Sequence, residues 1–206
     1  MLVSDSRKFI FIHIPRTAGI SVTQALTPFA DGADLDFSQM PWEKEYPHYT
    51  AEEIARIVGE ERFRGYFKFA FVRNPWERMV SRYFYLRKFN DRGDQPINMR
   101  NYYAPGSLSF SEWLTGTSQN AVHPLDMRRQ RDWLIRGEAW AADLIGRFEN
   151  LAQAIDTVNT MLNLDIVLPH ENRSDHTGYR EYYDDSTRDF VAQRFAADIE
   201  TWGYAF

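Results

Sequence analysis

The chain of 206 residues contains no cysteine. This absence excludes a disulfide framework, a thiolate nucleophile and a Cys-type zinc site, and it fits a reducing compartment. The chain also lacks an excess of positive charge, because its formal net charge is −5. General nucleic-acid binders need clustered Lys and Arg for their phosphate contacts, so a nucleic-acid partner is not expected. Any anion site must therefore be local.

Long hydrophobic runs are absent as well. The N-terminal segment MLVSDSRKFIFIHIP is ended by Pro15 and Arg16, well short of the roughly 18 apolar residues that span a bilayer. The sequence shows no signal peptide or membrane anchor, so we expect a cytoplasmic protein without a membrane partner. Repeats and Gly/Ser linkers are also missing, and the hydrophobic content is 44%. We expect one domain over residues 1–206, and the pattern sets no oligomeric state.

Two strand-to-helix units stand out along the chain. The run Phe9–Ile14 is apolar on both faces apart from one histidine, which predicts a strand buried in a parallel sheet. A helical pattern follows over Ile20–Leu26. The second unit pairs a strand at Phe67–Val72 with a helix from Pro75 to about residue 88, and Asn74 is its expected N-cap.

Further elements have weaker patterns. Thr50 and Glu53 are spaced as a capping box, which predicts a helix over residues 50–58. A short strand is expected at Asp143–Phe148, a helix at Leu151–Leu162 and a last helix at Ser186–Ile199. This alternation predicts a three-layer α/β/α fold with a central, mostly parallel sheet.

The first turn reads His-Ile-Pro-Arg-Thr-Ala-Gly-Ile-Ser from His13 to Ser21. Unpaired N–H groups and the helix dipole at such a turn suit a phosphate or sulfate. Gly19 is expected to permit a positive φ and close approach of the ligand. Thr17 and the serine can add hydroxyl donors, and Arg16 supplies charge. The local pattern fits an ordinary turn with a surface arginine equally well.

The second turn places Arg73 at the carboxyl end of its strand, the edge where ligands collect in open α/β sheets. Ser81 lies about two helical turns further on and could share a phosphate with this arginine. Alternatively, Arg73 pairs with a carboxylate and Ser81 is a packing residue. Taken together, the two turns would suit a nucleotide that carries two separated anionic groups.

These motifs also resemble a known family. IPRTAGISV and FVRNPWERMVSRYFY are similar to the 5′-phosphosulfate loop and the 3′-phosphate motif of sulfotransferases that use 3′-phosphoadenosine 5′-phosphosulfate (PAPS), specifically the carbohydrate-type and bacterial branch. The resemblance continues through GRFENL, LPHENRS and the closing WGYAF. It implies a P-loop NTPase-like sulfotransferase fold, PAPS as co-substrate, no metal, and in-line transfer of a sulfuryl group to a hydroxyl of a carbohydrate or other small metabolite.

The resemblance also assigns nucleotide contacts. It places the 5′-phosphosulfate against Arg16, Thr17, Ala18, Gly19, Ile20 and Ser21, the 3′-phosphate against Arg73 and Ser81, the adenine near Phe148, and a later nucleotide loop at Arg173 and Ser174. Two positions depart from the family pattern. Arg16 stands where a lysine is usual, which exchanges a compact donor for a planar fork, and Ile20 stands where a threonine is usual.

In-line transfer needs a base for the acceptor hydroxyl, and a histidine is the usual one. The resemblance places a base-like histidine in the segment of His48, while the alternative is a helix-entry histidine bonded to nearby backbone. His13 is expected to be a buried core residue. His123 and His170 look like loop residues that could line an acceptor cleft, and the fifth histidine is His176.

Two other functions remain open at this point. A small-molecule kinase also begins with strand, anion loop and helix, but the sequence lacks G-x-x-x-x-G-K-[ST]. A nucleotide-binding module without catalysis is compatible with the two departures. The polar stretch Asn90–Gly106 predicts a long surface excursion, and residues 90–140 are expected to bind the acceptor.

Overall fold

The computed structural model describes residues 1–37, 48–92, 108–116, 126–168 and 178–206. These residues divide into two compact units: residues 1–73 with 130–172 form the first, and residues 74–129 with 173–206 form the second. Among the described residues, no helix is both long and apolar enough to cross a bilayer.

The first unit is built on a sheet of four strands in the order β1-β2-β3-β6. The strands are β1 (Leu2–Ser4), β2 (Phe9–Ile12), β3 (Phe67–Val72) and β6 (Leu144–Arg147). β1 is antiparallel to β2, whereas β2, β3 and β6 are parallel, with Phe9 opposite Phe67 and Phe69 opposite Leu144. The expected central, mostly parallel sheet is confirmed.

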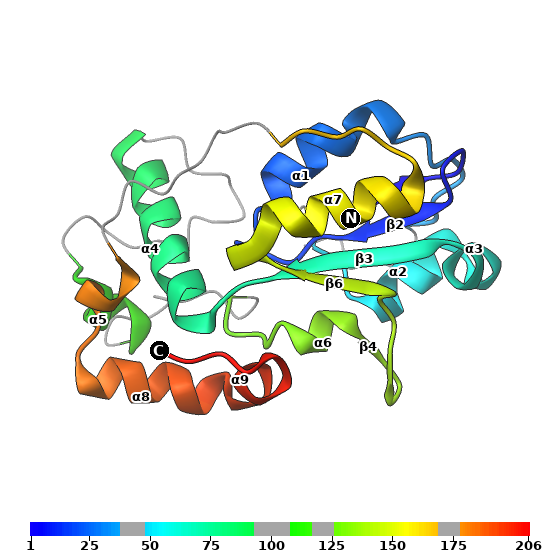
Figure 1. Ribbon diagram of the computed structural model, residues 1–206. Helices are drawn as coiled ribbons and strands as arrows, with labels where there is room; N and C mark the ends of the chain where they lie inside the picture. Colours follow the sequence, from blue (N-terminus) through cyan, green and yellow to red (C-terminus); the bar gives the residue numbers. More distant parts are fainter. Residues whose placement is uncertain (38–47, 93–107, 117–125, 169–177) are drawn as a thin grey trace. The chain divides into compact units, whose positions relative to one another are not determined.

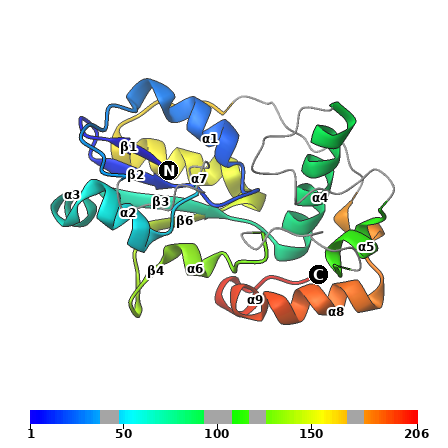
Figure 2. The same cartoon turned by 180° about the vertical axis from the view of Figure 1, so that it is seen from behind.

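Helices cover both faces of this sheet (Figures 1 and 2). The helices α1 (Gly19–Leu26) and α7 (Leu151–Leu162) lie on one face, and α2 (Ala51–Val58) and α6 (Arg131–Leu134) lie on the other. The remaining elements of the unit are α3 (Glu60–Gly65), the hairpin β4 (Ile135–Arg136) and β5 (Ala139–Trp140), and the 3-10 turns η1 (Thr27–Phe29) and η3 (Phe148–Asn150).

The core of the first unit follows from strand alternation. Phe9 and Phe11 of β2, together with Phe69 and Phe71 of β3, point to one face, where they pack against α1 and α7. All four rings are fully buried. The predicted capping box of α2 is confirmed. The Thr50 side chain accepts from the backbone N–H of Glu53, and the Glu53 carboxylate accepts from the backbone N–H of Thr50.

The second unit is helical in its described parts. It consists of α4 (Pro75–Arg92), α5 (Phe110–Leu114), the 3-10 turn η4 (Tyr179–Tyr182), α8 (Asp185–Arg194) and α9 (Ala196–Trp202). Asn74 caps α4 as predicted, since its Oδ1 accepts from the N–H of Trp76 at 3.0 Å. The helix continues four residues past its predicted end, and the excursion expected after it lies almost wholly outside the described residues.

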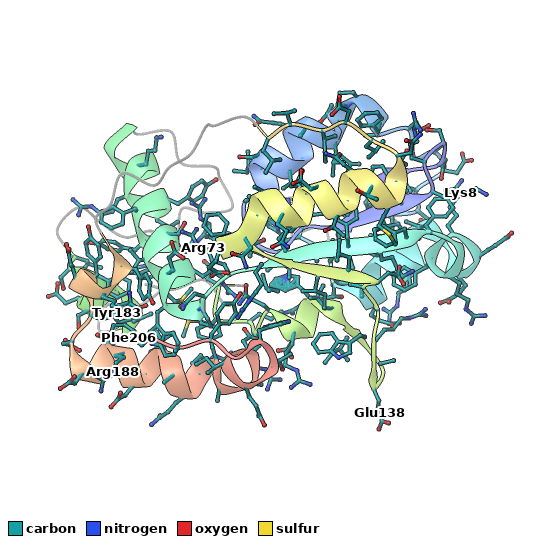
Figure 3. All side chains as sticks on the ribbon, viewed as in Figure 1. Lys8, Arg73, Glu138, Tyr183, Arg188 and Phe206 are labelled. Carbon is teal, nitrogen blue, oxygen red and sulfur yellow. The ribbon has the colours of Figure 1, made fainter. Side chains whose placement is uncertain are left out.

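Rings and one buried arginine hold the second unit together. Tyr183 contacts both Phe110 and Phe206 edge-on, with ring centroids 4.9 and 5.4 Å apart (Figure 3). Arg78 is fully buried over the ring of Phe195 and donates to the carbonyl of Asp126 at 2.6 Å. The arginine therefore ties α4 to the segment that begins at residue 126.

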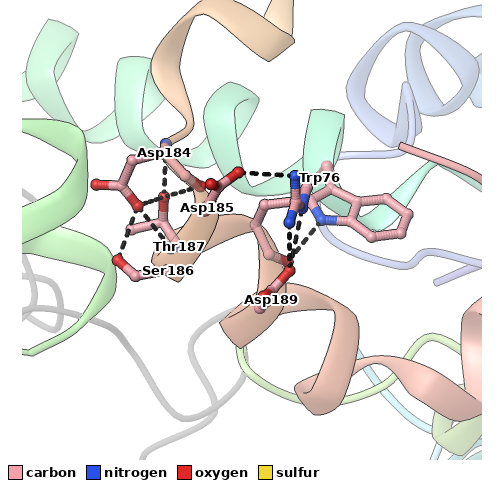
Figure 4. A network of polar contacts seen from close by, with 7 residues as sticks. Trp76, Asp184, Asp185, Ser186, Thr187 and Asp189 are labelled. Atoms are coloured by element: carbon pink, nitrogen blue, oxygen red, sulfur yellow. Dashed lines mark hydrogen bonds and ion pairs between the residues drawn. The ribbon is translucent and has the colours of Figure 1, made fainter.

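The C-terminal helical region differs from its prediction. The sequence predicted one helix over Ser186–Ile199, but the structure has two, α8 and α9, which break at Phe195 with φ −110° and ψ 22°. The phenylalanine side chain is fully buried at this break. Asp184 is the N-cap of α8, and its carboxylate accepts from the backbone N–H of Thr187 at 2.7 Å (Figure 4).

Candidate active site

The turn between β2 and α1 has the backbone of an anion-binding nest. Arg16 and Ala18 have positive φ of 68° and 67°, whereas Thr17 and Gly19 do not. Alternation of φ signs turns successive N–H groups toward one side, where they form a concave site for an anion. Ala18 is also the N-cap of α1 and has no side-chain capping bond, so the positive end of the helix dipole faces the same turn.

The side chains of this turn divide into structural and exposed ones. The hydroxyl of Thr17 is buried and donates to the carbonyl of Ile14 at 3.0 Å, which closes the turn. The hydroxyl proton of Thr17 is therefore already used within the turn. Ser21 is buried in the first turn of α1, while Ile20 is 46% exposed beside it.

Gly19 has a different role from the expected one. Its φ is not positive, so the expectation that it supplies a left-handed conformation is wrong. Instead, a Cβ on Gly19 would lie 1.7 Å from Nε2 of His13. Glycine is required here because the imidazole packs directly against the backbone.

Arg73 brings the second motif to the first. It lies at the end of β3 (Figure 3), is 4% exposed, and donates through its Nη1 to the carbonyl of Arg16 at 3.3 Å. Its guanidinium also stacks on the ring of Phe148, 3.9 Å from the centroid. Arg16, Arg73 and Phe148, which three separate motifs supplied, therefore meet at one edge of the sheet.

Gln130 holds the backbone of Arg73, and no sequence pattern predicted this role. The fully buried Gln130 side chain accepts from the backbone N–H of Arg73 at 2.8 Å and donates to its carbonyl at 2.8 Å. The amide thus imitates a strand neighbour just beyond the last residue of β3. No local pattern in DMRRQRDWL could reveal this partner, because the contact joins residues 57 positions apart.

His48 lies beside the same turn. Its Nδ1 is 3.0 Å from the carbonyl oxygen of His13, and a carbonyl only accepts, so this nitrogen carries hydrogen. In the neutral imidazole the basic nitrogen is then Nε2. The two histidine rings also meet edge to face, with centroids 4.5 Å apart.

His13 is buried, as expected, and is 7% exposed. Burial lowers the pKa of His13 well below its usual range, and the nearby charges of His48, the α-amino group and Arg16 lower it further. The imidazole is therefore neutral at physiological pH. It cannot serve as a cationic contact for a phosphate.

The other predicted contacts lie elsewhere. Ser81 belongs to α4 in the second unit, where it is buried. Arg173 and Ser174, as well as His123, His170 and His176, lie outside the described residues.

Comparison with known proteins agrees with this geometry. The sequence model of the sulfotransferase family matches residues 1–205. An uncharacterized protein of Archaeoglobus fulgidus is 34% identical over 111 residues, which cover 54% of this chain and 79% of that protein. The crystal structure of mouse sulfotransferase SULT7A1 complexed with PAP matches with a TM-score of 0.57 at 12% identity, covering 96% of this chain and 86% of that chain.

The structural match confirms the expected fold, and the family match covers nearly the whole chain. The chain therefore belongs to the sulfotransferase family, the PAPS-dependent transferases that its two turn motifs resemble.

Proposed function

We propose that the edge of the sheet where Arg16 and Arg73 meet binds PAPS, and that this enzyme passes its sulfuryl group to a hydroxyl of a carbohydrate or other small metabolite. The contact between Nη1 of Arg73 and the carbonyl of Arg16 carries the proposal. It joins the two anion motifs, so one ligand with two anionic groups can reach both.

The nest suits the 5′-phosphosulfate. Its N–H groups and the start of α1 are fixed donors, and fixed donors stabilise charge on a departing phosphate without reorganisation. Arg16 adds a formal positive charge beside them. The MgATP-type motif of a kinase is missing from this loop, which favours a sulfuryl donor over ATP.

Arg73 and Phe148 suit the opposite end of the nucleotide. Gln130 fixes the backbone of Arg73. The buried guanidinium is held by the carbonyl of Arg16 and the ring of Phe148. The guanidinium is therefore preorganised for a phosphate. The aromatic ring beneath it provides an apolar surface close to that phosphate. Contacts of the nucleotide with Ser81, Arg173 and Ser174 stay predictions from the sequence.

The proposed base is His48. As the hydroxyl oxygen attacks sulfur, the bond between sulfur and the phosphate oxygen breaks, and the hydroxyl proton passes to Nε2 of His48. The bond from Nδ1 to the carbonyl of His13 holds the required tautomer. The products are the sulfate ester and adenosine 3′,5′-bisphosphate (PAP).

The remaining parts of the proposal concern the whole chain. The family match over residues 1–205 supports a single sulfotransferase domain. Residues 90–140 are proposed to contact the acceptor, because they separate the nucleotide motifs from the later elements of the fold.

Two measurements test the function. Calorimetry should show that PAP binds and that ATP with Mg²⁺ binds far more weakly; the reverse preference would indicate a kinase. Radiolabelled PAPS should then be offered with a neutral oligosaccharide, a uronate-containing glycan and a simple phenol. Label transfer supports the enzyme, whereas tight PAP binding without transfer to any of them would indicate a silent nucleotide-binding module.

A further inference from the structure

His13 continues a row of core residues beyond the end of β2. Phe9, Phe11 and His13 alternate along the chain and share one face. The imidazole stacks on Phe11, with centroids 5.7 Å apart and planes 19° from parallel. The imidazole is thus packed on one face against the core of the first unit.

The same residue touches both halves of the proposed reaction site. Its Nε2 lies against Gly19, the first residue of α1, so closely that no Cβ fits between them. Its ring edge meets the ring of His48 at a centroid distance of 4.5 Å and an angle of 73°. Its carbonyl oxygen takes the hydrogen bond from Nδ1 of His48.

Burial and the charges around His13 make its imidazole a poor proton acceptor. The groups that act on it are His48, Arg16 and the α-amino group of Met1, and each of them can be positive. Together with burial they keep the imidazole neutral. The role left for His13 is a steric one, set by the shape of its ring and its place between α1 and His48.

On the basis of the proposed function, we propose that His13 is a positioning residue, a wedge that fixes the imidazole of His48 relative to the N-terminal turn of α1. The turn binds the group that is transferred, and His48 takes the proton. Displacement of about 1 Å between such groups can cost a factor of about a hundred in rate. A ring packed against both elements limits that displacement.

This role also explains why position 19 must be glycine. A methyl group there would collide with the imidazole, which also packs against the ring of His48. The effects of substitutions at Gly19 and His13 should therefore depend on each other, as expected for residues in direct contact.

A double-mutant cycle tests the wedge with His13→Ala, Gly19→Ala and the two combined. We expect His13→Ala to bind PAP within about threefold of wild type while the transfer rate from saturating PAPS falls at least about tenfold. Gly19→Ala should weaken PAP binding about tenfold or more, because the new methyl group collides with the ring. The double variant should bind PAP as tightly as His13→Ala does, because the collision is gone. Its transfer rate should stay as low as that of His13→Ala.

A spectroscopic measurement reads the position of His48 without any acceptor. With ¹⁵N-labelled histidine, His48 in the wild type should show one tautomer with hydrogen on Nδ1. In His13→Ala the population with hydrogen on Nε2 should rise. A mixture of tautomers already present in the wild type would overturn the proposal.

Packing loss needs its own control. Phe9→Leu removes part of the same core row without touching His48, so it should lower Tm yet keep the transfer rate. If His13→Ala proves too unstable, His13→Leu fills the buried volume without a ring and should show the same loss of transfer. Wild-type transfer in either His13 variant, or additive effects in the cycle, would overturn the wedge. A wild-type protein that fails to bind PAP would instead overturn the proposed function.

Discussion

Nη1 of Arg73 lies 3.3 Å from the carbonyl oxygen of Arg16, although 57 positions separate the two residues in the sequence. The arginine that directly follows β3 thus bonds the turn that follows β2. This hydrogen bond joins Arg73 to the first turn, and it is the contact on which the proposed site depends.

Replacing Arg73 should weaken nucleotide binding. Charge-assisted hydrogen bonds contribute roughly 1.5–3 kcal/mol each, so Arg73→Ala should lower PAP affinity by about ten- to a hundredfold. Arg73→Lys should lie between this variant and the wild type, because it keeps the charge and loses the planar fork. Calorimetry with PAP measures both.

Arg188 provides a matched control for Arg73. It is an arginine of α8 whose guanidinium pairs with Asp185 and Asp189, each at 2.9 Å, at the surface (Figures 3 and 4). Such surface pairs contribute little, so Arg188→Ala should leave PAP affinity unchanged. A folded Arg73→Ala protein with wild-type affinity would contradict the site.

Much of the fold around the proposed site could be predicted from the sequence, because the patterns that set it are local. The strand at Phe67–Val72, the N-cap at Asn74 and the capping box at Thr50 depend on neighbours within a few residues, and all three are confirmed. The arginines of the two turns were found for the same reason.

The parts that could not be predicted depend on distant contacts. The reason for Gly19 is the ring of His13, which reaches it across the turn. Gln130 holds Arg73 from another part of the chain. β1 has only three residues and no alternation that distinguishes it from a loop.

His48 should affect transfer and not binding. His48→Ala should preserve PAP affinity while the transfer rate falls by about a hundredfold or more, the usual contribution of a general base. His48→Gln is the sharper variant, because its amide can still donate to the carbonyl of His13 but cannot take a proton. Equal losses in both variants support proton transfer, whereas unchanged turnover would move the role to His123 or a carboxylate.

Arg16→Lys should keep or raise the transfer rate, because lysine restores the compact donor that is usual in the family. PAP affinity should stay within a few-fold of wild type. Arg16→Met, which keeps a long side chain without the charge, should lose transfer and serves as the control. A large loss of PAP binding in Arg16→Lys would count against aligning this residue with the family lysine.

Ala18→Gly should stabilise the fold. Ala18 has φ 67°, and a left-handed residue that carries a Cβ costs roughly 1–2 kcal/mol of stability. Glycine removes this cost, but it also makes the unfolded chain more flexible, which offsets about half of the gain. We expect the free energy of unfolding to rise by about 0.5 kcal/mol in urea titrations. Ala25→Gly, within α1 at ordinary helical geometry, should lower it by about 1 kcal/mol. The prediction fails if both variants are destabilised equally.

Acid should remove the advantage of aspartate over asparagine at the start of α8. The backbone N–H of Thr187, followed by the hydroxyls of Thr187 and Ser186, lowers the pKa of Asp184 from 3.8 to about 2 (Figure 4). The folded pKa lies below the unfolded one, so this stabilisation is complete above about pH 4 and is lost as the pH falls through about 2.

Asp184→Asn keeps the shape of the cap but cannot titrate. The wild type should therefore be more stable than Asp184→Asn by a constant margin between pH 5 and 7, and the margin should shrink between about pH 4 and 2. Asp31, whose pKa is also lowered to about 2 by the Ser6 and Ser4 side chains, is present in both proteins, so its contribution cancels in the difference. Urea titrations at each pH measure the margin. Parallel stability curves of the two proteins down to pH 2 would show that folding does not lower the pKa of Asp184.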